Sequence, residues 1–263
     1  MTAVEQVLQR ERAIVAATLA ALVLLSWFYL WQGAGMEMSA LDMTSLSLFP
    51  HLQRDMTGEM DAGWPVVAAM WWVMMVAMMT PSAAPLVLLY GRVLRHHAAA
   101  DRKAYVPSVF VAAGYLAVWL AFSLGAASLQ EALQNAGHLS GMMLWSKSAA
   151  LSATVLAAAG AYQLSPLKQA CLAHCRSPVQ FLTRYWRPGR RGAFLIGVRH
   201  GAYCVGCCWL LMALLFVGGV MNLLWIAALT AVVLVEKLST QGDRIGKFLG
   251  VVLIAWAAAT LLM

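Results

Sequence analysis

Seven long apolar runs, separated by short polar segments, constrain the fold of this chain more than any other feature. A helix needs about 20 apolar residues to cross the hydrocarbon core of a bilayer, whereas a membrane β-strand alternates apolar and polar residues over about 10 positions. With 62% hydrophobic and 11% charged residues, the chain is also unlike ordinary soluble domains. We therefore expect an all-α, polytopic membrane helix bundle in one domain, residues 1–263, with about seven transmembrane helices. The expected spans are 13–31, 64–89, 105–129, 147–164, 201–217, 220–235 and 246–263.

The fifth and sixth runs are short for a full crossing, at about 16 residues each. They either cross completely or form a re-entrant pair that turns back near Gly218-Gly219. Asn222 distinguishes these two arrangements, because an amide at the outer surface is simply solvated, whereas an amide at membrane depth needs a hydrogen-bond partner.

The net charge of +7 is distributed in a way that fixes an expected orientation. Lysine and arginine accumulate in the cytoplasmic loops of membrane proteins, and that pattern predicts an inner-membrane protein with a cytoplasmic N-terminus and an external C-terminus. The basic surplus is then expected to face the lipid bilayer rather than nucleic acid. The first run, 13–31, is longer than the apolar region of a signal peptide, so we expect it to be retained. The basic residues on the predicted inner side are Arg10, Arg12, Arg92, Arg95, Arg102, Lys103, Lys168, Arg176, Arg184, Arg187, Arg190, Arg191, Arg199, Lys237, Arg244 and Lys247.

Two polar segments complete the expected layout. Residues 32–63 form an outer, acidic, methionine-rich loop, and residues 165–199 form a basic cytoplasmic segment. The loop either packs its methionines onto the bundle, as methionine usually does, or collects Cu(I) through its thioethers. Its methionines are Met36, Met38, Met43, Met56 and Met60.

The second apolar run, 64–89, carries an unusual number of methionines. At 100° per residue they occupy about half of the helix circumference. They serve either as packing groups or as a ladder of thioether ligands for a soft cation. The residues are Met70, Met74, Met75, Met78 and Met79. Because Pro81 and Pro85 follow, we expect the helix to kink or break there, which makes Thr80-Pro81-Ser82 a second candidate site.

All the cysteines fall in two groups on either side of the basic segment. Cys171 and Cys175 are four residues apart, and Cys204, Cys207 and Cys208 have i, i+3, i+4 spacing. On a helix each group shares one face. Disulfides are not expected in the reducing cytoplasm, which leaves metal binding, redox chemistry or inert burial. Since both groups lie at the predicted inner face, we expect one composite metal site.

The soft ligands favour copper(I) as the metal, whereas four thiolates would also close a tetrahedral zinc site. Nearby cations depress a thiol's pKa and favour its metal-binding form, and those nearest in sequence to the thiols are Lys168, Arg176, Arg199 and His200. We expect Lys237 to pair instead with its neighbour Glu236. His174 points off the face of the first pair and is a weaker candidate ligand than the thiols.

Three sequence segments resemble a known family. They are Met74-Met75-x-Ala77-Met78-Met79-x-Pro81-Ser82; Leu164-Ser165-Pro166-Leu167-Lys168-x-x-Cys171-Leu172-x-x-Cys175-Arg176-Ser177-Pro178; and Gly201-x-x-Cys204-x-Gly206-Cys207-Cys208-Trp209. They are similar to segments of the bacterial predicted metal-binding integral membrane proteins, a domain family of unknown function, over about residues 64–263. The resemblance implies a membrane protein with a metal site and implies no established reaction.

These observations favour an inner-membrane protein that binds a soft metal ion, copper above all, and transports it or hands it to a metallochaperone or membrane complex. One alternative is a thiol redox protein that uses Cys204 and Cys207. Another is a structural or assembly factor of a membrane complex, with its cysteines merely buried. No hydrolase triad, phosphate loop or HExxH motif occurs in the sequence, so a non-enzymatic role is favoured.

Overall fold

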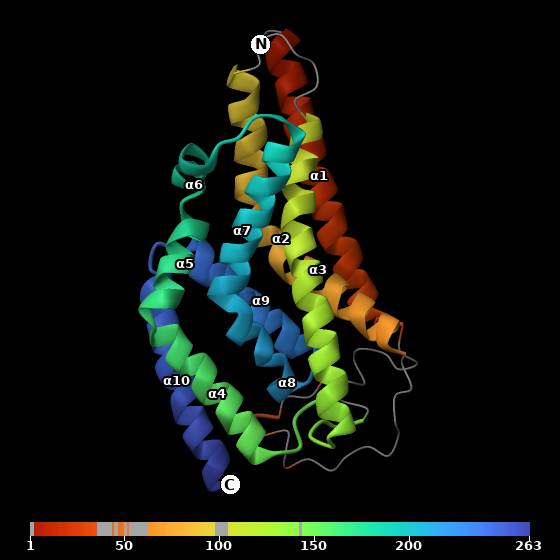
Figure 1. Ribbon diagram of the computed structural model, residues 1–263, viewed down its shortest axis with the longest axis vertical. Helices are drawn as coiled ribbons and strands as arrows, with labels where there is room; N and C mark the ends of the chain where they lie inside the picture. Colours follow the sequence, from red (N-terminus) through yellow and green to blue (C-terminus); the bar gives the residue numbers. More distant parts are fainter. Residues whose placement is uncertain are drawn as a thin grey trace.

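The computed structural model describes residues 3–35, 44, 47–49, 52, 63–97, 105–141 and 144–263, with side chains of helical residues given from residue 13 onward except for 95–97 and 105–107. The described residues form helices and no strand, apart from an isolated β-bridge between Leu139 and Ser146 (Figure 1). The all-α bundle predicted from the apolar runs is confirmed. The helices are α1 (Ala3–Trp31), α2 (Trp64–His97), α3 (Tyr105–Asn135), α4 (Ala149–Leu164), α5 (Pro166–Arg176), α6 (Pro178–Tyr185), α7 (Gly189–Ala213), α8 (Leu215–Gly218), α9 (Leu223–Leu238) and α10 (Gly242–Leu262).

Five helical segments in the described part of the chain are long and apolar enough to cross a membrane. They are Ala13–Trp31, Trp64–Leu94, Ser108–Asn135, Gly189–Gly218 and Gly242–Leu262. Helices α4 and α9 have 16 residues each, fewer than a full crossing requires. The expected number of seven spans is therefore not confirmed.

The helix that contains the fifth apolar run begins before the run itself. Helix α7 starts at Gly189, and with α8 it gives a segment of 30 residues to Gly218. The predicted start near residue 201 is wrong because Arg190, Arg191 and Arg199 lower the local hydropathy without interrupting the helix.

Asn222 is buried at the turn between α8 and α9. Its amide donates to the Gly218 carbonyl at 3.1 Å, and its oxygen accepts from the Trp225 backbone N–H at 3.2 Å. The side chain thus caps α9 and has the partners that an amide away from water requires.

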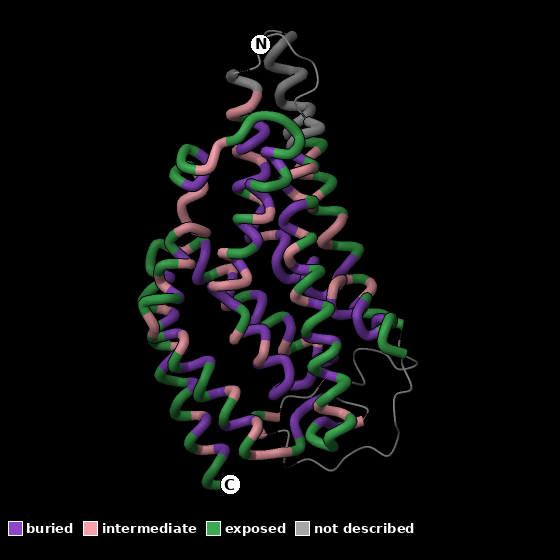
Figure 2. The backbone as a smooth tube through the Cα atoms, in the orientation of Figure 1, coloured by how far each residue is buried: buried purple, intermediate pink, exposed green. Residues whose placement is uncertain are grey.

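Helices α2 and α7 form the centre of the bundle. In each of them 61% of the most apolar window is buried, compared with 11% for α1. Helix α3 packs along α7 and α2, α4 packs along α10, and α1 covers α2 from outside (Figure 1). Figure 2 shows the buried residues concentrated on the inner helices. Large apolar side chains such as Leu24, Phe248 and Val251 are exposed on α1 and α10. These outward apolar faces are suited to contact with lipid.

The predicted kink in the methionine-rich helix is present without a break. Helix α2 remains continuous from Trp64 to His97, with Pro81 and Pro85 inside it, and it changes direction partway along (Figure 1). A proline removes a backbone donor and crowds the preceding turn, so this part of α2 is where its backbone groups most need other partners.

Several helices approach each other closely at glycines. A Cβ atom on Gly197 of α7 would lie 2.0 Å from the Val111 carbonyl oxygen of α3, and one on Gly114 of α3 would lie 2.2 Å from the Phe194 oxygen. Helices α4 and α10 meet in the same way at Gly160 and Gly250. Small residues let backbones approach closely where helices associate in a membrane, so these glycines set the spacing of the bundle.

Most of the predicted outer loop lies outside the described residues, including all five of its methionines. The described residues Thr44 and Leu48 contact the other end of the chain. The Thr44 hydroxyl accepts from the Leu223 N–H at 3.3 Å, and the Leu48 carbonyl accepts from the Trp256 indole at 3.0 Å.

We predict that Gly197→Leu destabilises the protein by at least about 1–3 kcal/mol, the usual cost of overpacking, because the new side chain must separate α7 from α3. The measurement is the unfolding midpoint of the purified protein in detergent. Gly125→Ala is the matched control, since a Cβ there meets nothing within 4 Å. Equal midpoints for the two variants would contradict the close α3–α7 packing.

Candidate metal centre

The two cysteine groups lie on helices that pack against each other. Helix α5 carries Cys171 and Cys175 and packs along α7, which carries the other group. Gly206 makes room for this contact, since a Cβ atom there would lie only 3.2 Å from the Cys171 sulfur. The side chains of Cys175 and Cys207 lie close enough to interact. The fold therefore joins the first group to the second at the Cys175–Cys207 contact.

The thiols of α5 do not have the depressed pKa that was expected from basic neighbours. Burial raises the pKa of Cys171. The hydrogen bond to Cys207, followed by burial, raises the pKa of Cys175 well above its usual value. The prediction is wrong for this group because the nearby basic side chains are engaged elsewhere.

Each of those basic side chains has another contact. Lys168 pairs with Glu236 at 2.6 Å. Arg176 pairs with Asp243 at 2.7 Å and donates to the carbonyls of Ser239 and Thr240. Arg199 lies over the Tyr185 ring at 4.3 Å. His200 is buried, with its ring 5.8 Å from that of Tyr115 and 5.3 Å from that of Phe181.

The cation that reaches the cysteines is Lys237. Its Nζ donates to the Cys204 sulfur at 2.8 Å and to the Ser82 hydroxyl at 3.3 Å. The expected pairing of Lys237 with Glu236 is therefore wrong. Adjacent residues on a helix point about 100° apart, so Glu236 faces Lys168 while Lys237 faces α7 and α2.

Cys204 lies at the centre of a buried polar cluster. The Tyr115 hydroxyl is 3.0 Å from its sulfur and donates to the Met79 carbonyl at 2.9 Å. Ser82 donates to the same carbonyl at 2.8 Å. The cluster thus joins α3, α7 and α9 to the kinked part of α2, which was the second candidate site in the sequence.

The other two thiols of α7 point to the same region. The Cys207 and Cys208 thiols both donate to the Cys204 carbonyl, at 3.1 Å and 2.9 Å. The Cys208 sulfur is also 4.0 Å from the Met79 sulfur. This contact brings a thioether of α2 next to the cysteines, as a mixed thiol and thioether site requires.

The methionines of α2 face the interior of the bundle rather than lipid. All five are fully buried, and they share one apolar cluster with Cys204, Cys207 and Cys208, as do Met212 and Met221. This cluster makes the centre of the protein rich in sulfur. The five are Met70, Met74, Met75, Met78 and Met79.

The described contacts of His174 are with groups other than the thiols. Its ring stacks on Tyr203 with centroids 4.3 Å apart, and its Nδ1 is 2.8 Å from the Ala170 carbonyl oxygen.

A second buried network lies beside the first. Lys168 donates to Glu236 and to the Gln163 oxygen, and the Gln163 amide donates to Glu236 at 2.7 Å. All three side chains are buried. The Glu236 carboxylate therefore holds the end of α9 to the end of α4 and to α5.

The donor set suits a soft ion of low coordination number. Thiolate and thioether ligands select Cu(I), for which two sulfur ligands suffice. Within the described residues, no group of three or more His, Cys, Asp or Glu side chains is arranged to hold a metal ion. The alternative of a closed zinc site with four thiolates therefore gains no support.

Sequence reasoning missed Lys237 and Tyr115 as members of the site, and it named Ser82 only within the separate candidate Thr80-Pro81-Ser82. The available signal was Lys237 itself, a charged residue at the end of the apolar run 220–235. Charged residues in such positions face the interior and have partners. Tyr115 carried no comparable signal, since a single tyrosine in a long apolar helix is ordinary.

Comparisons with known proteins support a link to copper. The family model PpoB2, described as copper chaperone, matches residues 68–260, which include almost all of α2 and every cysteine. No curated protein and no solved structure matches the chain.

We predict that Glu236→Gln lowers the stability of the protein by about 3–5 kcal/mol, because it leaves Lys168 as an uncompensated buried charge. The double change Lys168→Met/Glu236→Met should restore most of that loss, since two apolar groups need no partner. Unfolding midpoints in detergent measure both effects. A double variant less stable than Glu236→Gln would show that the pair does not act as described.

Proposed function

The chain belongs to the PpoB2 copper chaperone family, and on that premise we propose that it binds Cu(I) as cargo inside a membrane-embedded helix bundle and hands it to an acceptor. Copper then binds among the sulfurs of α5, α7 and the centre of α2. The protein acts as a carrier and not as an enzyme.

The observation that carries this proposal is the meeting of soft ligands from three helices. Cys175 contacts Cys207, and Met79 contacts Cys208. Either pair supplies two soft donors for Cu(I). Because Cys204, Cys207 and Cys208 lie on adjacent turns of one helix, copper passes between the pairs by exchanging one sulfur for another.

Lys237 has a defined role in this scheme. Metal coordination removes the protons of thiols, so Cu(I) held by two thiolates leaves one net negative charge in an environment from which water is excluded. Buried charge requires a partner, and the ammonium group 2.8 Å from the Cys204 sulfur is placed to balance it. Tyr115 contacts Cys204 as well, and Ser82 accepts a second hydrogen bond from Lys237.

We propose that the methionines of α2 form the route by which Cu(I) reaches the cysteines from the outer end of the bundle. Thioethers bind Cu(I) without losing a proton, so an ion moves along them without a change of charge on the ligands. Met79 is the last of the series and touches Cys208. The cysteines are then the cytoplasmic end of the route, in an inner membrane.

The binding of copper is tested by its retention in the purified protein after anaerobic loading with Cu(I). The wild type should retain stoichiometric copper, and the variant with all five cysteines changed to serine should lose it, because serine is a poor ligand for a soft ion. Elemental analysis gives the copper content. Among single variants, Cys207→Ser should lose more copper than Cys171→Ser, since Cys171 is only half-buried against Gly206.

Two outcomes would refute the proposal. One is a wild-type protein that retains no copper, and the other is equal retention by the variant without cysteines. The unfolding midpoint of each variant is measured alongside, so that loss of copper is not confused with loss of fold.

A change at Lys237 tests whether this side chain supports copper binding or only the structure. Lys237→Met should weaken Cu(I) binding by about 10- to 100-fold, because a hydrogen bond to a charged group is worth about 1.5–3 kcal/mol. Its unfolding midpoint should stay the same or rise, since an apolar side chain replaces a buried charge. Competition with a Cu(I)-selective chelator measures the affinity.

Lys247→Met is the matched control, because Lys247 is exposed on α10. Unchanged copper affinity in Lys237→Met, or equal weakening in Lys247→Met, would remove Lys237 from the binding site.

A further inference from the structure

The segment of residues 165–199 is strongly one-sided in charge. It contains seven basic residues and no aspartate or glutamate. Lys168 and Arg176 pair with carboxylates of α9 and α10. For the other five, no ion pair is formed within the described part of the chain. They are Arg184, Arg187, Arg190, Arg191 and Arg199.

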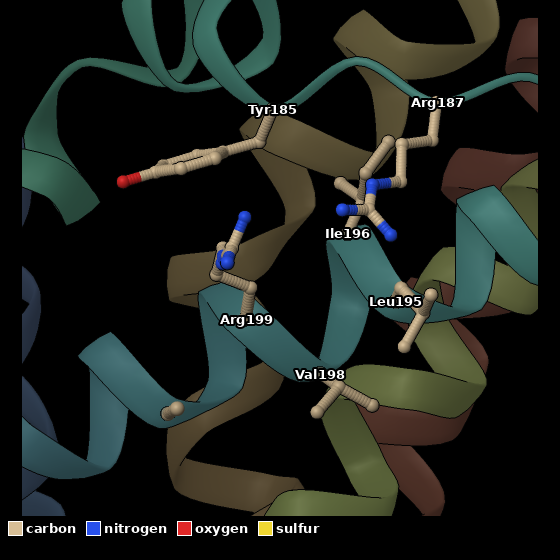
Figure 3. Close-up of a pocket in the computed structure, with 7 residues that line it drawn as sticks. Tyr185, Arg187, Leu195, Ile196, Val198 and Arg199 are labelled. Carbon is tan, nitrogen blue, oxygen red and sulfur yellow. The ribbon is translucent and has the colours of Figure 1, made fainter.

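Two of these arginines line a surface pocket of about 260 Å³ between the α6–α7 connection and the face of α7. Figure 3 shows Arg199 beneath the Tyr185 ring and Arg187 on the opposite side, above Ile196 and Leu195. The volume corresponds to several water molecules at about 30 Å³ each, which is enough for a phosphate group. The remaining lining residues are the apolar Val198 and Ala202.

Local structure holds the Arg199 guanidinium group and the Arg187 backbone in place. Arg199 lies over the Tyr185 ring with its Cζ atom 4.3 Å from the centroid, a cation–π contact. Arg187 is fixed through its backbone, because the connection turns at Gly189 (φ +78°) and packs on Gly192. A Cβ atom on Gly192 would lie 2.5 Å from the Arg187 carbonyl oxygen. The fold therefore fixes one guanidinium group of the pocket and the point from which the other extends.

We propose that this pocket binds the phosphate headgroup of an anionic phospholipid. Arginine guanidinium groups recognise phosphate oxygens with two parallel hydrogen bonds, and the pocket carries positive charge without an acidic side chain among its lining residues. This inference rests on the placement of the bundle in a membrane and is independent of the copper site.

The surroundings of the pocket favour a lipid over free phosphate. Leu195 and Phe194 on the same helix are 46% and 37% exposed, and Leu195 and Val198 line the pocket directly below the arginines. A lipid satisfies both parts at once, because its headgroup meets Arg187 and Arg199 while its acyl chain lies along the apolar face of α7. Basic pockets next to membrane helices bind anionic headgroups in this way.

The test is native mass spectrometry of the full-length protein in detergent, with phosphatidylglycerol or phosphatidylcholine added. We expect the wild type to retain phosphatidylglycerol in preference to phosphatidylcholine. The variant Arg187→Gln/Arg199→Gln should bind it about 30-fold more weakly, the factor expected for the loss of two basic contacts to an anionic headgroup. Arg191→Gln/Arg244→Gln, which loses the same charge at exposed positions outside the pocket, should bind it like the wild type.

Three results would overturn the proposal. Equal loss in both double variants would mean that binding follows net charge. Equal retention of the two lipids would mean that the headgroup charge is not recognised. Displacement of the lipid by inorganic phosphate at the same concentration would mean that the pocket binds a free anion. Copper retention by Arg187→Gln/Arg199→Gln should equal that of the wild type, so failure here is distinguishable from failure of the copper proposal.

Discussion

Buried charge at the end of α9 is the constraint on which the rest of the site depends. An ionised side chain away from water needs a partner of opposite charge or a hydrogen bond, and two such side chains follow each other at positions 236 and 237. Glu236 is satisfied by Lys168 of α5, and Lys237 by Cys204 of α7 and Ser82 of α2. Meeting both requirements brings together the helices that carry sulfur. The cysteines of α5 and α7 and the methionines of α2 are thus held in register by polar contacts as well as by packing.

Close helix packing then gives this polar centre its precision. Gly197 and Gly114 let the backbones of α7 and α3 touch, and Tyr115 follows Gly114 directly. Its hydroxyl is thereby placed between Cys204 and the Met79 carbonyl. Gly206 plays the same part on the other side of α7, where Cys171 lies against it. A glycine at each of these contacts lets side chains of different helices approach each other closely.

The sequence predicted well those parts of the structure that depend on the periodicity of apolar residues and cysteines. It predicted less well where a helix starts and which neighbouring helix a side chain faces. Long apolar runs were sufficient for an all-α bundle, and the spacing of the cysteines placed each group on one helix face. The charge distribution put both groups at the same end, and Cys175 does contact Cys207. The start of α7 was missed because arginines lower hydropathy without ending a helix. The partner of Lys237 was missed because adjacency in sequence does not reveal which helix each neighbour faces.

The two short helices have a consequence for the membrane itself. Helices α4 and α9 have 16 residues each, and at about 1.5 Å per residue they extend only about 24 Å, less than the roughly 30 Å thickness of a typical hydrocarbon core. Backbone groups at both ends of each helix are nevertheless hydrogen-bonded. The side chains of Ser148 and Asn222 cap the first turns, and the backbone N–H groups of Ser165 and Ser239 bond to the last turns. Helices with satisfied ends tolerate a local thinning of the bilayer, and such hydrophobic mismatch costs only fractions of a kcal/mol per Å. Gln163, Glu236 and Lys237 lie at these shortened ends, so a thinned bilayer would bring water closer to the cysteines.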